Sequence, residues 1–201
     1  DMKTIVHEIP YSPASNLDEE IFTASSVFFD IETTGFSPAH TSLYLIGCAY
    51  HIKQMLYIKQ YFAETPEEEK EVLEQFLLLL DGFDTIITFN GIGFDIPYLK
   101  AKCNTYECNE HFADFTYVDI FKSISQIKHI LQLPNYKQKT IEAFLGIGRD
   151  DLYSGGELIE IYHSYTREPR PDKLEILLLH NYEDVLDLPS LLPVLSYDHL
   201  F

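Results

Sequence analysis

Two carboxylates, Asp30 and Glu32, stand two residues apart in the largely apolar stretch FFDIETTGF, residues 28–36. Side chains alternate along a β-strand, so both acids would project from one face while Phe29 and Ile31 project from the other. Neighbouring anions at the end of a buried strand are tolerated only where a cation offsets their repulsion and lost hydration. The stretch alone predicts either a metal-binding strand or a strand that ends at Ile31, with Glu32 solvated in the turn.

A third acid, Asp95, follows the segment TFNGIGF at residues 88–94, where a short predicted strand at 84–90 is succeeded by a helix. Aspartate is a favoured residue at a helix start, and Pro97 fits the first turn of a helix that begins there. Helix capping and metal ligation therefore both explain Asp95 when it is considered alone.

The segment LLLHNYEDVLDLPSLL, residues 177–192, carries a histidine and an aspartate on a predicted helix. His180 and Asp184 are four residues apart, and residues at this spacing share one helix face. Leu177 and Leu188 belong to the apolar side of the same helix, which favours a pair turned toward the body of the protein. On its own, however, the pair is most simply explained as a surface ion pair of little energetic consequence.

Together, the three segments supply four carboxylates and one histidine from a strand, a helix start and a late helix. Oxygen ligands of this kind suit the hard divalent cations Mg²⁺ and Mn²⁺ better than they suit zinc. The combination predicts a site for two such ions, whose charge would offset that of the clustered acids.

The motifs DIETTG, NGIGFD and HNYED occur in that order and resemble the three exonuclease motifs of the DnaQ-like, or DEDD, 3′–5′ exonuclease superfamily, which has a ribonuclease H-like fold. A longer stretch, from KTIEAFLGIGRDD at 139–151 to the late helix, more closely resembles the YprB-type ribonuclease H-like exonuclease domain. The resemblance extends over residues 26–195. It implies that the metal-binding acids are Asp30, Glu32, Asp95 and Asp184.

The position of the histidine departs from the superfamily pattern. The tyrosine branch of the superfamily has its tyrosine four residues before the last aspartate, and the histidine branch has its histidine five residues before it. In this chain His180 stands four residues before Asp184, at the spacing of the tyrosine, and Tyr182 stands at neither place. We expect His180 to be the general base or the water-positioning group, because imidazole accepts a proton near neutral pH.

The resemblance implies hydrolysis of nucleic-acid phosphodiester bonds, at single-stranded ends, with two ions about 4 Å apart that activate water and stabilise the leaving oxygen. Asp30 would bridge both ions, and Glu32 and Asp184 would hold the water-activating one, with Asp95 supporting the other. The residues expected to contact substrate adjoin the acids: Thr33, Thr34, Gly35, Phe36, Asn90 and Phe94. Phe36 would stack on a terminal base or, on equal grounds, pack in the core.

The chain is strongly acidic, with 14 Lys and Arg against 32 Asp and Glu and a net charge of −18. Taken over the whole molecule, that balance argues against nucleic-acid binding, because phosphate contacts need Lys and Arg. Residues 120–149 are the exception, with a local balance of +4 from Glu142 and five cations: Lys122, Lys128, Lys137, Lys139 and Arg149. We expect this segment to hold the backbone of a bound strand.

The remaining pattern predicts an α/β domain. A short link joins the predicted strands at 42–50 and 54–62, which is typical of an antiparallel pair, and we expect the strand at 26–32 to precede this pair in a meander. With the ribonuclease H-like resemblance, we expect a mixed five-stranded sheet, the meander first and parallel strands after it, flanked by helices. Residues 1–25 are interpreted as an irregular N-terminal extension and residues 26–201 as the exonuclease domain.

No run of eighteen apolar residues occurs, which excludes a membrane span, and the first ten residues lack the apolar core of a secretory signal. The three cysteines form no disulfide pattern and suit a reducing cytoplasm, where we expect the protein to act. Cys103, Cys108 and His111 supply only three of the four ligands of a structural zinc site, so free cysteines are favoured over zinc.

Two other functions remain open from the sequence. A degenerate exonuclease fold would serve as a binding or scaffold module, which the acidic composition and the spacing of His180 favour, although such a module needs no buried anions. A ribonuclease H-like nuclease that cuts internally would use the same acids. The sequence does not separate DNA from RNA, or an exonuclease from an endonuclease.

Overall fold

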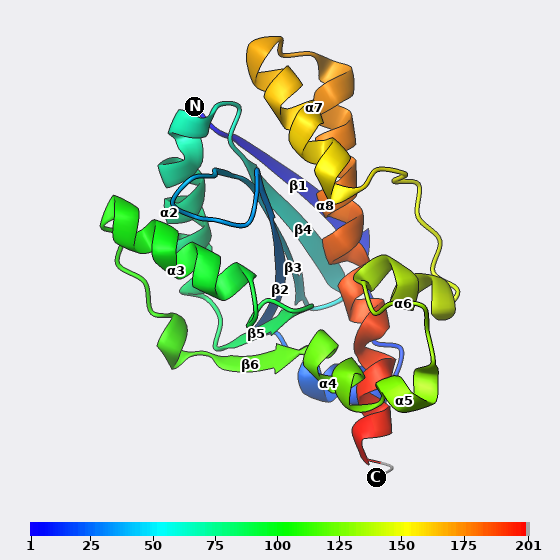
Figure 1. The fold of residues 1–201 in the computed structure, drawn as a ribbon. Helices are drawn as coiled ribbons and strands as arrows, with labels where there is room; N and C mark the ends of the chain where they lie inside the picture. The colour runs from blue at the N-terminus through cyan, green and yellow to red at the C-terminus, as the bar shows by residue number, and fades with distance from the viewer. Residues whose placement is uncertain (200–201) are drawn as a thin grey trace.

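A mixed sheet of six strands, in the order β1-β4-β3-β2-β5-β6, forms the centre of the molecule. The computed structural model describes residues 1–199, and the surroundings of side chains up to residue 196. Figure 1 shows the sheet between two groups of helices. The strands are β1 (Lys3–Pro10), β2 (Ser26–Thr33), β3 (Leu43–Ile52), β4 (Met55–Phe62), β5 (Thr85–Thr88) and β6 (Thr116–Asp119).

The pairing of the strands follows the prediction in its main features. β2, β3 and β4 form an antiparallel meander, whereas β5 pairs parallel with β2 and β6 pairs parallel with β5. A tight turn links β3 to β4, and Lys53 adopts a left-handed backbone conformation there, with φ of 56°. The expected mixed sheet, with the meander first and parallel strands after it, is confirmed.

The N-terminal residues differ from the expectation. We expected residues 1–25 to be irregular and the sheet to have five strands, but β1 pairs antiparallel with β4 along its whole length and adds a sixth. The first helix, α1, follows at Asn16–Ile21. Most residues of β1 are partly or fully exposed at the edge of the sheet, so its sequence shows no clear alternation, and pairing with β4 decides its structure.

The helices beyond α1 flank the sheet. The helical stretch after β6 is divided near Ile127, and the last α-helix changes to a 3-10 helix after Leu191. None of the described helices is long and apolar enough to cross a membrane. The bounds are α2 (Glu69–Leu80), α3 (Asp95–Tyr106), α4 (Ile120–Gln126), α5 (Lys128–Leu131), α6 (Gln138–Phe144), α7 (Gly155–Arg167) and α8 (Pro171–Leu191).

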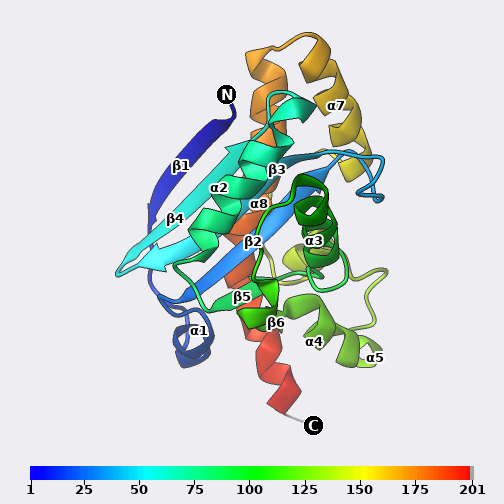
Figure 2. The same ribbon diagram turned by 90° about the vertical axis from the view of Figure 1, so that its left-hand side faces the viewer.

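The two faces of β2 pack against different helices. α2 and α3 lie in front of the sheet in Figure 2, and Phe29 and Ile31 join the apolar core on that side. α8 runs behind the sheet and contacts β2, β3 and β4. Phe28 of β2 shares a core cluster with Val185 and Leu188 of α8. Since side chains alternate along a strand, the two acids of β2 also face α8.

Candidate active site

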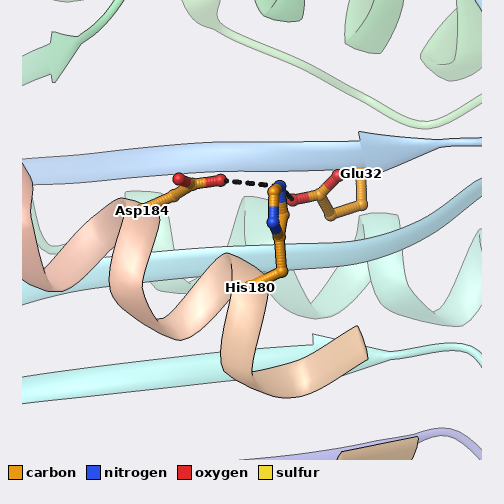
Figure 3. A group of neighbouring side chains, drawn as sticks. All are labelled: Glu32, His180 and Asp184. Atoms are coloured by element: carbon orange, nitrogen blue, oxygen red, sulfur yellow. Dashed lines mark ion pairs between the residues drawn. The ribbon is translucent and has the colours of Figure 1, made fainter. Parts of the chain in front are cut away.

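The structure brings β2 and α8 together at the acids. Nε2 of His180 lies 3.6 Å from Oε1 of Glu32 and 3.2 Å from Oδ2 of Asp184. Figure 3 shows the imidazole of His180 between the two carboxylates. These three residues each offer a ligand atom within 4.8 Å of the others, and they are the only such group of three among the described residues. The four-residue spacing therefore does not keep His180 from the acids.

A close approach of α8 to β3 sets the position of this helix. A Cβ atom on Gly47 would lie 2.1 Å from Oδ1 of Asn181, so only glycine leaves room for the helix at this distance. Gln60 of β4 donates through its amide to that same Oδ1 at 3.0 Å and to the carbonyl of Leu178 at 2.9 Å. The amide of Asn181 lies 3.4 Å from Oδ2 of Asp30. These contacts hold the helix turn that carries His180 over β2.

Asp95 is the first residue of α3, and its charge repels the carboxylates of Asp30 and Glu32. Its side chain is buried, with 5% of the residue exposed, and Phe94 rather than Asp95 is the N-cap residue. The turn before it is held by Asp119, whose carboxylate accepts the backbone N–H groups of Asn90 at 2.8 Å and Ile92 at 3.2 Å. The structure thus favours a role for Asp95 other than that of the N-cap residue.

Burial and mutual repulsion raise the pKa values of three of the acids, and Asp184 is one source of the repulsion. Burial raises the pKa of Asp30 well above its usual range, and repulsion by Asp184, Glu32 and Asp95 raises it further. Burial, followed by repulsion from Asp184 and Asp95, does the same for the pKa of Glu32. Burial is the main reason that the pKa of Asp95 rises to about 7. The acids therefore lack sufficient positive charge from the protein itself.

The lack of compensating groups is most evident at Oε1 of Glu32. It is buried and has no hydrogen-bond partner. Buried polar atoms in native proteins are almost always paired, so an unpaired carboxylate oxygen here fits a ligand position for a cation. The donor set is carboxylate oxygen, with one imidazole nitrogen, which fits Mg²⁺ or Mn²⁺.

Arg149 supplies part of the compensation, and the expectation for this residue was wrong. We expected Arg149 to hold the backbone of a strand, but its guanidinium is turned inward and only 7% exposed. It forms an ion pair with Asp184 at 2.6 Å and hydrogen bonds with Glu142 at 3.1 and 3.2 Å. Burial lowers the pKa of Arg149, but the attraction of Asp184 and Glu142 outweighs this and raises it. Arg149 is therefore a fixed internal cation.

Asp151 contacts the other side of His180, and our sequence analysis did not identify it. Its Oδ2 lies 2.6 Å from Nδ1 of His180, and it also accepts from Nζ of Lys139 at 2.6 Å. Burial raises the pKa of Asp151, but hydrogen bonds from Lys139 and the backbone N–H of Tyr153, with the attraction of His180, give a net lowering. An ionised carboxylate can only accept, so Nδ1 of His180 donates. The only sequence signal is the motif GRDD, within the stretch that resembles the YprB-type domain.

The expected substrate residues at 33–36 lie in the turn after β2. Oγ1 of Thr33 donates to the carbonyl of Gly35 at 2.8 Å. The N–H of Thr34 donates to the carbonyl of Ser42, and its hydroxyl accepts from the N–H of Ser42, so both groups serve the turn. Gly35 has φ of +155°, and a Cβ atom there would lie 2.8 Å from Cγ2 of Thr41. These residues shape the turn, and contact with substrate remains a prediction for them.

Phe36 and Phe94 form an aromatic pair at the end of that turn. Phe36 is 89% exposed, so the alternative that it packs in the core is wrong. Its ring lies edge-on to that of Phe94, with 5.9 Å between the ring centroids. Asn90 is exposed and adopts a left-handed conformation with φ of 65° after β5. An exposed aromatic ring beside a cluster of acids is suited to stacking on a base.

The three cysteines lie on β3, on α3 and just after α3. Cys48, Cys103 and Cys108 are free thiols, and Cys103 is buried with 1% exposure. Within residues 1–196 they do not form a metal-binding cluster with His111.

Comparison with known proteins places this geometry in a family. A family model described as the RNase_H superfamily matches residues 27–196. A DNA polymerase of Methanocaldococcus jannaschii is 42% identical over 43 residues, which are 21% of this chain and 3% of the polymerase. The expected ribonuclease H-like fold is thereby confirmed.

Solved structures of two other proteins are also similar. The family B DNA polymerase of the hyperthermophilic archaeon Pyrobaculum calidifontis superposes with a TM-score of 0.63 at 17% identity, over 87% of this chain and 24% of the polymerase chain. A structure of exonuclease I superposes with a TM-score of 0.49 at 14% identity, over 76% of this chain and 42% of the other. The chain thus spans about a quarter of the first structure, which it resembles in fold.

Proposed function

Because the chain belongs to the RNase_H superfamily, we propose that it is a metal-dependent 3′–5′ exonuclease that hydrolyses phosphodiester bonds at single-stranded ends of nucleic acid. One observation carries the proposal. Glu32, His180 and Asp184 converge within 4.8 Å, and Oε1 of Glu32 is buried without a hydrogen-bond partner. A purely structural site would pair that oxygen, so its lack of a partner favours a cation that arrives from solution.

The four acids offer the oxygen ligands and the negative charge that two divalent ions require. The residues that would hold them are Asp30, Glu32, Asp95 and Asp184, with Mg²⁺ or Mn²⁺ as the cations. When bound, two ions of this kind supply an activated water and stabilise the developing charge on the phosphate and the leaving oxygen. The raised pKa values of Asp30 and Glu32 describe the metal-free protein, and bound cations would favour the ionised forms.

His180 would accept the proton of the attacking water at Nε2. The hydrogen bond from Nδ1 to Asp151, at 2.6 Å, leaves Nε2 as the nitrogen that faces Glu32 and Asp184. A base must lie within hydrogen-bond reach of the water, and Nε2 occupies such a place among the acids. Asp151 acts through His180 and is therefore a positioning residue.

Arg149 would position Asp184. Its guanidinium binds Oδ1 of Asp184, whereas Oδ2 of the same carboxylate faces His180. A second hydrogen bond, from Arg149 to the carbonyl of His180 at 3.2 Å, ties the guanidinium to the same helix turn. One carboxylate oxygen is thus fixed by the protein while the other faces the reaction site.

Two alternatives compete with this function. The scaffold alternative drew support from the irregular spacing of His180, but the imidazole lies among the acids regardless of that spacing. An endonuclease would use the same acids, and the exposed Phe36 beside the site is the feature that favours an end-recognising enzyme, since a stacked terminal base needs a free aromatic face.

Hydrolysis of end-labelled oligonucleotides tests the proposal. Single-stranded DNA and RNA, labelled at the 5′ end, are incubated with Mg²⁺, Mn²⁺ or EDTA, and a circular single strand serves as a substrate without ends. We expect stepwise shortening from the 3′ end with Mg²⁺ or Mn²⁺ and none with EDTA or with Asp30→Asn. Asp114→Asn is the matched control, because Asp114 is an exposed acid outside the site.

Three results would contradict the proposal, and each points to a different alternative. Cleavage that persists in EDTA or in Asp30→Asn would reject the metal-dependent mechanism. Cutting of the circular strand would identify an endonuclease. No hydrolysis under any condition, together with no heat of Mn²⁺ binding in calorimetry, would favour the scaffold module.

A further inference from the structure

A cleft of about 850 Å³ opens directly beside the acids. Asp30, His180 and Asp184 line one part of it, and Phe89, Asn90 and residues from the segments 121–140 and 152–157 line the rest. We call it the lysine cleft, and define it by six of its lining residues: Phe121, Lys128, Tyr136, Lys137, Lys139 and Tyr153. Because it adjoins the acids, a chain bound in the cleft would pass the site of hydrolysis.

Beyond the acids of the site itself, the walls of the lysine cleft carry three lysines and one acid, Glu157, although the protein as a whole is acidic. The molecule carries a net charge of −18, yet three lysines line this one cleft. Lys139 is engaged, since its ammonium binds Asp151 at 2.6 Å. Lys128 and Lys137, by contrast, form no ion pair within residues 1–196, and Lys137 is exposed. Two ammonium groups are therefore available to an anionic ligand.

Aromatic rings alternate with these cations. The ammonium of Lys128 lies 4.8 Å from the ring centroid of Phe121 and 4.9 Å from that of Tyr136. The hydroxyl of Tyr136 donates to the carbonyl of Lys128 at 2.9 Å, which fixes the ring in this position. Tyr153 is exposed and precedes α7. Cations interleaved with aromatic rings are typical of sites that bind single-stranded nucleic acid, because phosphates pair with the cations and unstacked bases stack on the rings.

We propose that the lysine cleft binds the single-stranded nucleic acid next to the scissile phosphate, with Lys128 and Lys137 on phosphates and Tyr136 and Tyr153 on bases. The inference rests on the proposed function and adds to it the residues that would hold the single-stranded substrate beside the acids. Phe36 and Phe94 do not line the cleft, so the terminal base and the rest of the strand would contact different walls. A duplex would keep its bases stacked internally and would not offer them to Tyr136 or Tyr153.

Fluorescence anisotropy of a labelled 12-nucleotide single strand, DNA or RNA, tests the proposal without any need for hydrolysis. The Asp30→Asn protein in EDTA is the background, so the strand stays intact. The combined variant Lys128→Gln and Lys137→Gln should raise Kd about tenfold and reduce the slope of log Kd against log salt by about 0.7 for each lysine. The matched control, Lys53→Gln with Lys100→Gln, removes the same charge from lysines that do not line the cleft and should change Kd less than twofold.

The aromatic part of the proposal has its own variant. Tyr153→Ala alters an exposed side chain, so the fold should be retained, and we expect Kd to rise at least fivefold. Lys137→Gln alone is a second variant at an exposed position and should raise Kd about threefold.

Some outcomes would overturn this inference and leave the proposed function intact. Equal losses of affinity in the cleft and control variants, or tighter binding of a blunt duplex than of the single strand, would reject the cleft as the binding site. If the wild-type protein hydrolyses single strands but the cleft variants keep its KM and Kd, the nuclease proposal stands and the cleft proposal fails. If the strand binds the cleft but no metal supports hydrolysis, the cleft proposal stands and the nuclease proposal fails.

Discussion

Buried acids at two places in this protein are compensated in different ways. Glu69, on the α2 side of the sheet, is 2% exposed and pairs with Nζ of Lys102 at 2.8 Å. It also accepts hydrogen bonds from the backbone N–H of Leu43 and the hydroxyl of Tyr106. At the candidate active site, the carboxylates of Asp30, Glu32 and Asp95 have raised pKa values, and one oxygen of Glu32 has no partner.

The comparison shows that the protein neutralises the buried charge of Glu69 with its own groups but does not do so for the acids of the candidate active site. Glu69 is neutralised by groups of the same chain, so it contributes to packing and offers no position for a ligand. The acids near α8 have Arg149 as their nearby cation, and Arg149 is shared among Asp184, Glu142 and other acids. A deficit of positive charge that the fold leaves uncorrected is expected at a functional site, where a ligand supplies the remainder.

The largest expected effect comes from removing the acid with the unpaired oxygen. Glu32→Gln should lower the rate of hydrolysis at least about 10³-fold, equivalent to about 4 kcal/mol, because a ligand of the proposed cations is lost. The same change should raise the free energy of unfolding of the metal-free protein by about 1 kcal/mol, because the repulsion among the acids decreases. Single-turnover kinetics and urea denaturation in EDTA measure the two effects. A loss of both activity and stability would mean that Glu32 is compensated in the way Glu69 is.

Removing the partner of Glu69 should lower stability and leave activity unchanged, which is the opposite of the effect expected for Glu32→Gln. Lys102→Met leaves a buried carboxylate without its cation and should lower the free energy of unfolding by about 3–5 kcal/mol. Urea denaturation measures this, and the combined variant Lys102→Met with Glu69→Gln should recover most of the loss. Activity per folded molecule should stay unchanged. If the double variant is no more stable than the single one, the ion pair is not the reason for the destabilisation.

The contact between Asp151 and His180 gives an intermediate effect. Asp151→Asn keeps the size of the side chain but removes the charge that fixes the hydrogen on Nδ1, so kcat should fall about 10²-fold while KM changes little. The nitrogen chemical shifts of His180 in NMR spectra of the metal-free protein report which nitrogen carries the hydrogen. They should show Nδ1–H in the wild type and a mixture of forms in the variant. An unchanged spectrum would remove Asp151 from the positioning role, whatever the activity.

The smallest effect concerns pH. The pKa of Asp95 is about 7 in the folded protein and that of an ordinary aspartate is 3.8, so the folded state holds a proton that the unfolded chain releases. For Asp95 alone this linkage amounts to about 4 kcal/mol, and the lowered pKa values of Asp151 and Glu64 act against it. The free energy of unfolding in EDTA should therefore show a net decrease between pH 4 and 7 of roughly 1–3 kcal/mol. Urea denaturation at several pH values measures this. Mn²⁺ should remove the decrease, and a rise in stability between pH 5 and 7 in EDTA would contradict the prediction.

The positions of Asp30, Glu32, His180 and Asp184 relative to one another were predictable because each of these residues stands in a local pattern. The alternation in β2 places Asp30 and Glu32 on one face, and the helical spacing places His180 beside Asp184. Both inferences need only the geometry of a single element, and the structure agrees with each of them. The antiparallel pairing of β3 with β4 was also predictable, because the short link between them leaves few ways to connect the two strands.

Features that depend on the approach of distant segments were not predictable. Arg149 was counted with the other cations of residues 120–149, but the packing of its loop against α8 turns it inward to Asp184. Asp151 meets His180 across 29 residues of sequence, and neither residue type nor spacing indicates the contact. β1 is likewise determined by pairing with β4, since its own sequence shows only a weak strand pattern.

Gly47 has a consequence for how this protein tolerates mutation. It carries no functional group and lies in the middle of β3, yet any side chain there would collide with Asn181 on the turn of α8 that bears His180. The collision would displace the histidine and Asp184 from the acids of β2 together. In a saturation screen scored by nuclease activity, Gly47 should therefore be as intolerant of substitution as the acids themselves, and the screen alone would misidentify a spacer as a catalytic residue.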